Sequence, residues 1–362
     1  MAGGWRRPSL ANTLKALFAL ALGALGGWIF YTLRLPLPWM LGSLSLTMIA
    51  ALLGAPLHGP TGLRNGLIAL LGIMIGSGFT ATMLRQAGEW LISLAAIVAY
   101  IGLTGIVVFA YLRRFGRFDR VTSYFMAMPG GLNEMTAIGH AMGGDDRAIA
   151  LSHAWRMIIV VFTIPLSFRF FAGYIPPAVV FTGGFAQIGA LDWSLLIACG
   201  ILGTGLGRLL RLPAPFLTGS MALSALLHVT GYTQFRVPPL LVLLAQIGIG
   251  AGLGARFADV KLHALWRVVS VGTGSALMML ANTVLCSLAV AALTGLPVAA
   301  LLLAYAPGGL AEMSIIALSL GIDAPFVSAH QLTRILAVIF IAPLFFRLLP
   351  SRANLAAAPA DD

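Results

Sequence analysis

A seven-residue motif that combines helix-breaking residues with a carboxylate occurs twice in this chain of 362 residues. Each copy lies in the middle of an apolar stretch long enough to cross a bilayer. A carboxylate beside interrupted backbone at membrane depth is typical of a site for an ion or a small solute. The copies lie 178 residues apart and read Pro129-Gly130-Gly131-Leu132-Asn133-Glu134-Met135 and Pro307-Gly308-Gly309-Leu310-Ala311-Glu312-Met313.

Each motif predicts that a helix stops and restarts, because proline lacks an N–H donor and paired glycines relax the helix. The second half-helices would begin near Leu132 and Leu310. Glu134 and Glu312 would then lie in a first turn, where the helix dipole favours a negative charge. In the alternative interpretation, each glutamate only caps its own half-helix and the glycines only permit close packing.

Two arginines, Arg156 and Arg334, each follow the motif glutamate by 22 residues, inside the next apolar segment. A lone arginine at bilayer depth costs at least about 2.5 kcal/mol on insertion scales. The two arginines and two glutamates form a neutral set, so we expect mutual pairing. The pairs are either static salt bridges, or they open when an anion binds an arginine or a proton binds a glutamate. The predicted substrate- and ion-binding residues are Pro129, Gly130, Gly131, Asn133, Glu134, Pro307, Gly308, Gly309, Glu312, Arg156 and Arg334.

Three histidines near this region, His140, His153 and His330, are candidates for a proton relay, because histidine titrates near neutral pH. Packing or interfacial roles are the alternative, and His153 aligns with Gln331 in the second half. Asn133 aligns with Ala311, so Asn133 would supply either a polar contact unique to the first half or an ordinary helix N-cap.

Composition indicates a polytopic all-α membrane protein, since 59% of residues are hydrophobic, 9% are charged and the mean hydropathy is +0.97. The net charge of +11 does not indicate nucleic-acid binding, because the basic residues lie at the ends of apolar segments, as the positive-inside rule explains. The chain has no Walker A, HExxH or paired CxxC motif, and two cysteines form no metal spacing. We therefore expect no metal, no cofactor and no enzymatic activity.

Twelve apolar segments are predicted, six in each of two membrane repeats at residues 10–172 and 191–350. A linker at 173–190 would join the repeats, and a disordered tail would occupy 351–362. The predicted segments are 14–33, 38–54, 65–84, 89–112, 121–143, 147–171, 191–210, 214–230, 238–256, 264–293, 297–320 and 325–349.

The duplication extends beyond the motif, since Arg34-Leu35-Pro36-Leu37-Pro38 matches Arg211-Leu212-Pro213-Ala214-Pro215 and Gly42-Ser43 matches Gly219-Ser220. A long repeat in a membrane protein predicts two related half-bundles with discontinuous helices. Inverted halves place more of the basic loop residues on one side, and so the charge rule favours inversion. Whether the motif segments cross the membrane or re-enter, giving twelve or ten spans, stays open.

The paired PGGLNEM and PGGLAEM motifs, with RLPLPWMLGS and RLPAPFLTGS, resemble the AbrB-type duplicated membrane protein family of bacteria over about residues 14–349. The resemblance implies a description as a regulator of gene expression, or the label ammonia monooxygenase. The scattered histidines do not support an oxygenase, because such a metal centre needs a compact ligand set. A regulatory effect would be indirect, since the chain has no cytoplasmic domain for DNA.

These observations predict an ion-coupled secondary transporter in the bacterial inner membrane. Its solute would be a small anion, because two arginines and two helix N-termini suit negative charge, and its coupling ion would be H⁺ or Na⁺. The alternative is a membrane sensor or regulatory protein that binds a ligand without transporting it. The expected partners are the lipid bilayer, the solute, the coupling ion and further copies of the chain.

Overall fold

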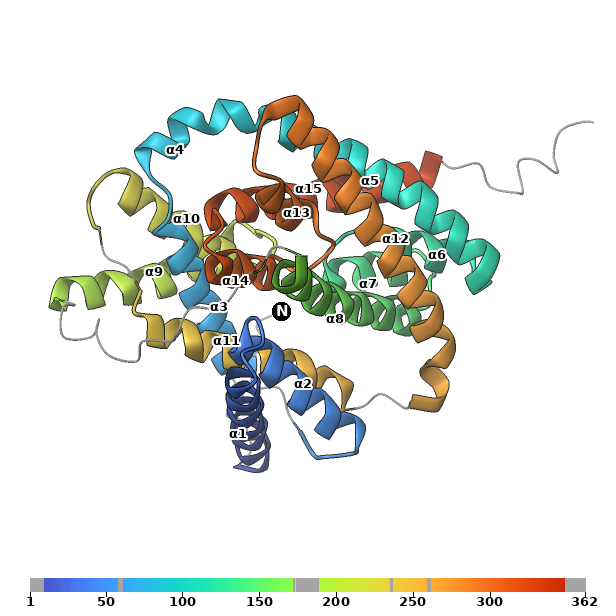
Figure 1. The fold of residues 1–362 in the computed structure, drawn as a ribbon, viewed down its shortest axis with the longest axis horizontal. Coiled ribbons are helices and arrows are strands. Elements are labelled where there is room, and N and C mark those ends of the chain that lie inside the picture. The colour runs from blue at the N-terminus through green and yellow to red at the C-terminus, as the bar shows by residue number, and fades with distance from the viewer. Residues whose placement is uncertain are drawn as a thin grey trace, which may run out of the picture. The chain divides into compact units, whose positions relative to one another are not determined.

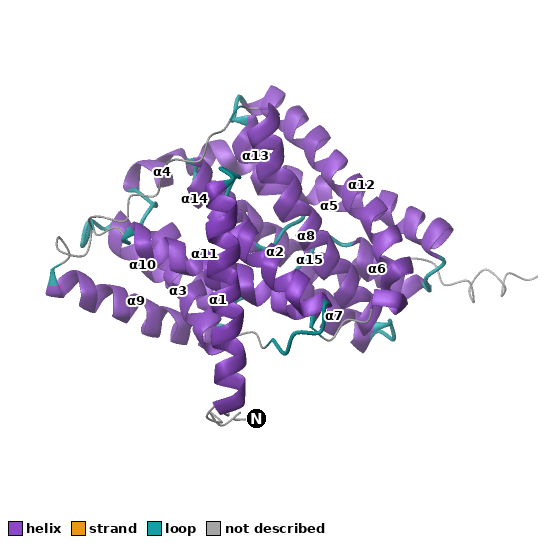
Figure 2. Ribbon diagram, turned by 60° about the horizontal axis from the view of Figure 1, so that its bottom comes forward, coloured by secondary structure: helices purple, strands orange, loops and turns teal. Residues whose placement is uncertain are grey.

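All regular structure in the described part of the chain is helical (Figure 2), in a computed structural model that describes residues 10–57, 61–171, 173, 189–234, 237–258 and 262–348. The predicted all-α fold is therefore confirmed for these residues. The predicted tail at 351–362 and nearly all of the predicted linker at 173–190 lie outside them.

The helices follow the predicted apolar segments closely, and each motif segment is divided into two helices (Figure 1). In the first half they are α1 (Leu10–Thr32), α2 (Pro38–Leu52), α3 (Thr61–Gly76), α4 (Ala81–Gln86), η1 (Ala87–Trp90), α5 (Leu91–Tyr111), η2 (Leu112–Gly116), α6 (Arg120–Ala127), α7 (Leu132–Ala141) and α8 (Asp146–Phe171). In the second half they are α9 (Ala190–Leu209), α10 (Pro215–Val229), α11 (Pro239–Gly254), η3 (Ala255–Phe257), α12 (Leu262–Thr294), α13 (Val298–Tyr305), α14 (Leu310–Leu320) and α15 (Ala324–Leu348).

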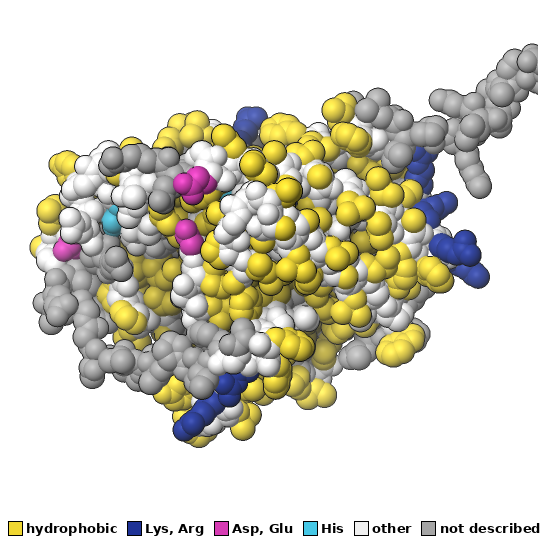
Figure 3. Space-filling view, turned by 45° about the horizontal axis from the view of Figure 1, so that its top comes forward, with side chains coloured by type: hydrophobic (Ala, Val, Ile, Leu, Met, Phe, Trp, Pro, Cys, Tyr) yellow, Lys and Arg dark blue, Asp and Glu magenta, His cyan; other side chains and the backbone are white. Residues whose placement is uncertain are grey.

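Among the described residues, seven helical segments are long and apolar enough to cross a membrane. Large apolar side chains stay exposed on them, including Ile106 at 71%, Ile201 at 68% and Phe340 at 73%. Hydrophobic side chains also make up most of the coloured surface in Figure 3, where charged side chains occur in only a few places. An apolar surface of this kind is stable only against lipid. The chain is a multi-pass membrane protein.

Two compact units divide the helices, and each unit draws on both halves of the sequence. The first unit comprises Met1–Trp90, Val161–Trp266 and Leu310–Ser328. The second unit comprises Leu91–Val160, Arg267–Gly309 and Ala329–Asp362.

In the first unit, the two RLPxP sequences build the same turn before α2 and α10. Arg34 and Arg211 both adopt φ 52°, and Leu37 and Ala214 adopt φ 44° and 48°. The proline that follows is the first helical residue in both cases. This position suits proline, because its missing N–H needs no partner there.

Glycines let the helices of the first unit cross at backbone contact. A Cβ at Gly42 of α2 would overlap the carbonyl of Gly26 in α1, and one at Gly219 of α10 would overlap that of Gly203 in α9. Serine hydroxyls join these pairs to their neighbours. Ser43 donates to the Ile247 carbonyl of α11 and Ser224 to the Ile73 carbonyl of α3, both at 2.8 Å.

The second unit holds α5, α6, α7 and α13, together with parts of α8, α12 and α15. Its buried interior contains aromatic and polar groups close together. The rings of Tyr100 and Tyr305 lie 5.6 Å apart, and the Tyr100 hydroxyl lies 3.2 Å from Thr283 Oγ1. The Tyr124 hydroxyl donates to the carbonyl of Ala342 on α15. Residues 128–131 and 306–309, at which the two motif helices are interrupted, belong to this unit.

Candidate functional site

The helix interruptions occupy residues 128–131 and 306–309, between α6 and α7 and between α13 and α14. Pro129, Gly130, Pro307 and Gly308 lie within them. A helix that ends leaves its last carbonyls without helical partners, and in an apolar interior these carbonyls need other donors. The second unit supplies the donors from α8 and α15.

Arg156 and Arg334 bind the two interruptions through equivalent contacts. Arg156 donates from Nη1 to the Met128 carbonyl at 3.0 Å and from Nη2 to the Gly130 carbonyl at 2.8 Å. Arg334 donates from Nη1 to the Ala306 carbonyl and from Nη2 to the Gly308 carbonyl, the latter at 2.7 Å. Donor and acceptors in the second set all lie 178 residues after those in the first. Each arginine therefore hydrogen-bonds the backbone at one helix interruption.

His153 and Gln331 add a second contact of the same kind, one turn before each arginine. His153 Nε2 donates to the Phe125 carbonyl at 3.0 Å, and Gln331 Nε2 donates to the Leu303 carbonyl at 2.7 Å. Because a carbonyl only accepts, Nε2 of His153 carries a proton. The neutral amide of Gln331 therefore makes, in the second half, the same contact that the imidazole of His153 makes in the first half. This geometry favours a structural role for His153 over a proton relay.

The two arginines are buried positive charges for which the described part of their unit supplies no carboxylate partner. Arg156 is 3% exposed and Arg334 is 1% exposed, inside membrane-spanning α8 and α15. Their charges act on each other and on the nearby Tyr100. The Nε atom of each is buried and has no hydrogen-bond partner, and no described carboxylate of the second unit forms an ion pair with either arginine. An anion could satisfy both the charge and the open donors.

Glu134 does not pair with the arginines, contrary to the charge-balance expectation, because backbone carbonyls occupy their Nη groups. Glu134 is half-buried in the first turn of α7, and its carboxylate folds back over Gly131, the N-cap residue. A Cβ at Gly131 would overlap Glu134 Oε2. The glycine therefore makes room for the carboxylate at the positive end of α7.

Glu312 belongs to the first unit and is 3% exposed. It interacts electrostatically with Arg256 of η3, which is also within range of Arg64 on α3. Arg256 lies in no motif that would have indicated this contact, so its interaction with Glu312 was not predicted. Within the first unit, Glu312 thus faces positive charge from outside the predicted set.

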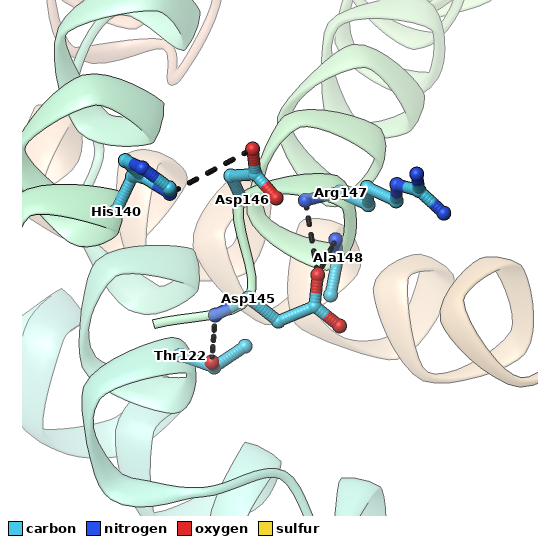
Figure 4. A network of polar contacts seen from close by, with 6 residues as sticks. All are labelled: Thr122, His140, Asp145, Asp146, Arg147 and Ala148. Carbon is cyan, nitrogen blue, oxygen red and sulfur yellow. Dashed lines mark hydrogen bonds and ion pairs between the residues drawn. The ribbon is translucent and has the colours of Figure 1, made fainter. Parts of the chain in front are cut away.

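Asn133 is exposed, and the N-cap position beside it belongs to Gly131, so Asn133 is not the cap of α7. His140 is also at the surface: its side chain is 72% exposed and its Nδ1 lies 3.8 Å from Asp146 (Figure 4). His330 is fully buried, and its Nε2 lies 2.8 Å from Ser93 Oγ. The three histidines therefore occupy different environments.

Asp145 and Asp323 begin the helices that carry the arginines. Asp145 Oδ1 accepts from the backbone N–H groups of Arg147 and Ala148 (Figure 4), and Asp323 Oδ1 accepts from that of Phe326. Both aspartates thus cap α8 and α15. In the described residues no group of three or more His, Cys, Asp or Glu side chains could hold a metal ion.

Residues 39–350 match the family model described as transition state regulatory protein AbrB. The chain is 28% identical to uncharacterized protein YhjN of Bacillus subtilis (strain 168), over 93% of this chain and 94% of that protein. It is 25% identical to an Escherichia coli (strain K12) protein named as a regulator, AbrB, over 90% and 93% of the two chains. This chain, a multi-pass membrane protein, belongs to the AbrB family.

Proposed function

We propose that the protein is an ion-coupled secondary transporter of a small anionic solute in the bacterial inner membrane. The observation that carries the proposal is the pair of buried arginines at the two helix interruptions, each with an Nε donor that has no partner. A permanent static role would favour full pairing, because an unsatisfied buried donor on a charged group costs more than about 1–3 kcal/mol.

The anion would bind between groups that already share the interior of the second unit. The two Nε donors provide charge-assisted hydrogen bonds, and the Tyr100 and Thr283 hydroxyls lie in the same region. Two charges that have no carboxylate partner among the described residues of the unit favour a small anion over a neutral solute. The apolar surroundings strengthen these interactions by excluding water.

Binding would be linked to the shape of the interruptions. The guanidinium groups that attract the anion also hold the carbonyls of Met128 and Gly130, and of Ala306 and Gly308. An anion that draws a guanidinium toward itself weakens these carbonyl contacts. The short helices can then shift, as alternating access requires at discontinuous helices. Glu134 and Glu312 would take up the coupling H⁺ or Na⁺, because a carboxylate can exchange either one.

Thermal unfolding in detergent tests the anion site. Formate, acetate, nitrate, sulfate and phosphate are compared with gluconate as a bulky control at equal ionic strength. We expect at least one small anion to raise the melting temperature of the wild-type protein. Arg156→Gln and Arg334→Gln should abolish this shift, whereas the exposed Arg211→Gln should retain it. Equal shifts in all four proteins would contradict the site.

A ligand-binding sensor is the second candidate, because a relative carries the name of a regulator. Proteoliposomes distinguish the two functions. The anion that stabilises the protein is supplied outside under an imposed H⁺ or Na⁺ gradient. A transporter accumulates it inside, whereas a sensor binds it without uptake. Neither function includes a catalytic step, and we infer that the protein is not an enzyme.

A further inference from the structure

A large groove lies in the first unit between α3, α9 and α10, all labelled in Figure 1. Its volume is about 990 Å³, and its walls are mainly apolar. Gly62, Gly66 and Gly205 line it, and a Cβ added at any of the three would meet no atom within 4 Å. The groove is therefore wide enough to accept a ligand without rearrangement.

The groove exists because α9 lies farther from α3 than α1 lies from α11. A Cβ on Gly23 of α1 would touch Ala251 and Ile247 of α11 at 3.2 and 3.4 Å. The matching residue on α9 is Gly200, whose Cβ would reach only Ile73 of α3, at 3.8 Å. Helix α1 thus packs directly against α11, whereas α9 leaves a gap beside α3.

One end of the groove is polar. Thr204 is only 7% exposed, its hydroxyl has no hydrogen-bond partner, and it lines the groove. Arg208 follows one turn later, with its guanidinium 4.5 Å from the ring centre of Phe216. A guanidinium stacked on a ring still has its edge donors available. None of the described residues that line the groove is an aspartate or glutamate.

The apolar part of the groove follows the membrane-spanning helix α9. Trp193 lines it near the start of the helix, and Arg208 lies near the end. Fifteen residues separate them, which is about 22 Å along a helix and more than half of a hydrocarbon core of about 30 Å. Ile197 and Ile201 also line the groove and are 55% and 68% exposed. Lipid hydrocarbon can therefore reach the groove from the membrane.

We propose that this groove binds a phospholipid with an anionic headgroup. An acyl chain lies along the glycine-lined apolar wall, the phosphate accepts hydrogen bonds from Arg208, and an ester carbonyl accepts one from the Thr204 hydroxyl. Basic pockets between membrane helices recognise anionic headgroups in this way. The site is independent of the anion site in the second unit.

Native mass spectrometry of the full chain in detergent tests the proposal with dioleoylphosphatidylglycerol and dioleoylphosphatidylcholine. We expect one phosphatidylglycerol to bind more tightly than phosphatidylcholine, by about fivefold for one arginine near the headgroup. Arg208→Gln should remove this preference, and Thr204→Val should weaken it. Arg211→Gln is the control, because Arg211 does not line the groove. Equal affinity of the wild type for both lipids overturns the proposal. So does an equal loss of the phosphatidylglycerol preference in Arg208→Gln and Arg211→Gln.

Gly66→Leu provides a test that does not depend on charge. Leucine favours helix over glycine, and a Cβ at Gly66 would meet no atom within 4 Å, so the fold should be retained. The variant should show no preference for phosphatidylglycerol over phosphatidylcholine. Its melting temperature without lipid should stay unchanged or rise. Retained preference would overturn the site. The oligomeric state is measured in the same spectra. If the wild type is a dimer and Gly66→Leu is a monomer, the proposal is also overturned, because a second copy of the chain would then occupy the groove.

Discussion

Arg156 and Arg334 use different atoms for two different tasks. The Nη groups complete the backbone of the interrupted helices, and the Nε groups remain open. An arginine at this position therefore has a structural role even without a ligand. For this reason the anion site is tested by the loss of an anion-dependent shift and not by loss of stability alone.

The contacts of His153 and Gln331 predict that these side chains can be exchanged. His153→Gln and Gln331→His should each preserve a donor to the carbonyl of Phe125 or Leu303. His153→Ala should lower the free energy of unfolding by about 1–3 kcal/mol, because a buried carbonyl loses its donor. Thermal or urea unfolding in detergent measures this. If His153→Gln abolishes proton-coupled uptake in a folded protein, the imidazole does titrate during function.

The two glutamates should differ in their effect on stability. Glu312 is buried and attracts Arg256 in the first unit, whereas Glu134 is half-buried at a helix N-terminus. Glu312→Gln leaves the charge of Arg256, which Arg64 repels, without this carboxylate, so we expect a lower melting temperature than for Glu134→Gln. The matched pair is compared in one detergent at one pH. A larger loss in Glu134→Gln would contradict the assigned environments.

At the scale of helices, charges of opposite sign mark the two sides of the interruption between α6 and α7, which lies within the second unit. Arg156 binds the carbonyls of Met128 and Gly130 after α6, and Glu134 lies in the first turn of α7. Each charge complements the dipole of the short helix beside it. The arrangement explains how interrupted backbone is stabilised in an apolar interior.

Close glycine contacts between helices predict position-specific effects of alanine. Gly42→Ala and Gly219→Ala would place Cβ against a neighbouring backbone carbonyl, and we expect a loss of about 1–3 kcal/mol for each. Gly205→Ala is the control on α9, because its Cβ meets no atom within 4 Å. It should be neutral or stabilising, since alanine favours helix over glycine. Equal melting temperatures in all three variants would rule out backbone contact at these crossings.

Hydrophobic stretches and prolines predicted most helices, because length and apolar content decide what can cross a bilayer. The residues that bind the interruptions were only partly predictable. Arg156 and Arg334 were found from their charge, but their carbonyl partners could not be inferred, since a backbone acceptor leaves no signal in residue type. The shared role of His153 and Gln331 was not predicted either. Both donate an N–H to a backbone carbonyl, and residue type does not reveal such an acceptor.

At the scale of the whole molecule, the positive-inside rule predicts a topology that can be measured. We expect the segment from Arg113 to Arg120 and the segment from Arg256 to Arg267 to share the cytoplasmic face. Single cysteines are introduced in each segment after replacement of Cys199 and Cys286 and are labelled from outside intact cells. Neither segment should react before the cells are permeabilised. Strong labelling of one segment alone would exclude inverted halves.

The central claim is that the arginine pair binds a small anion whose movement is coupled to the motif carboxylates. Uptake into proteoliposomes under an H⁺ or Na⁺ gradient tests it most directly, with the anion that stabilises the detergent-purified protein. We expect gradient-driven accumulation by the wild type. Arg156→Gln and Arg334→Gln should show no uptake, and Glu134→Gln and Glu312→Gln should lose the dependence on the gradient. Normal gradient-driven uptake with both glutamates replaced, or with either arginine neutralised, would contradict the account.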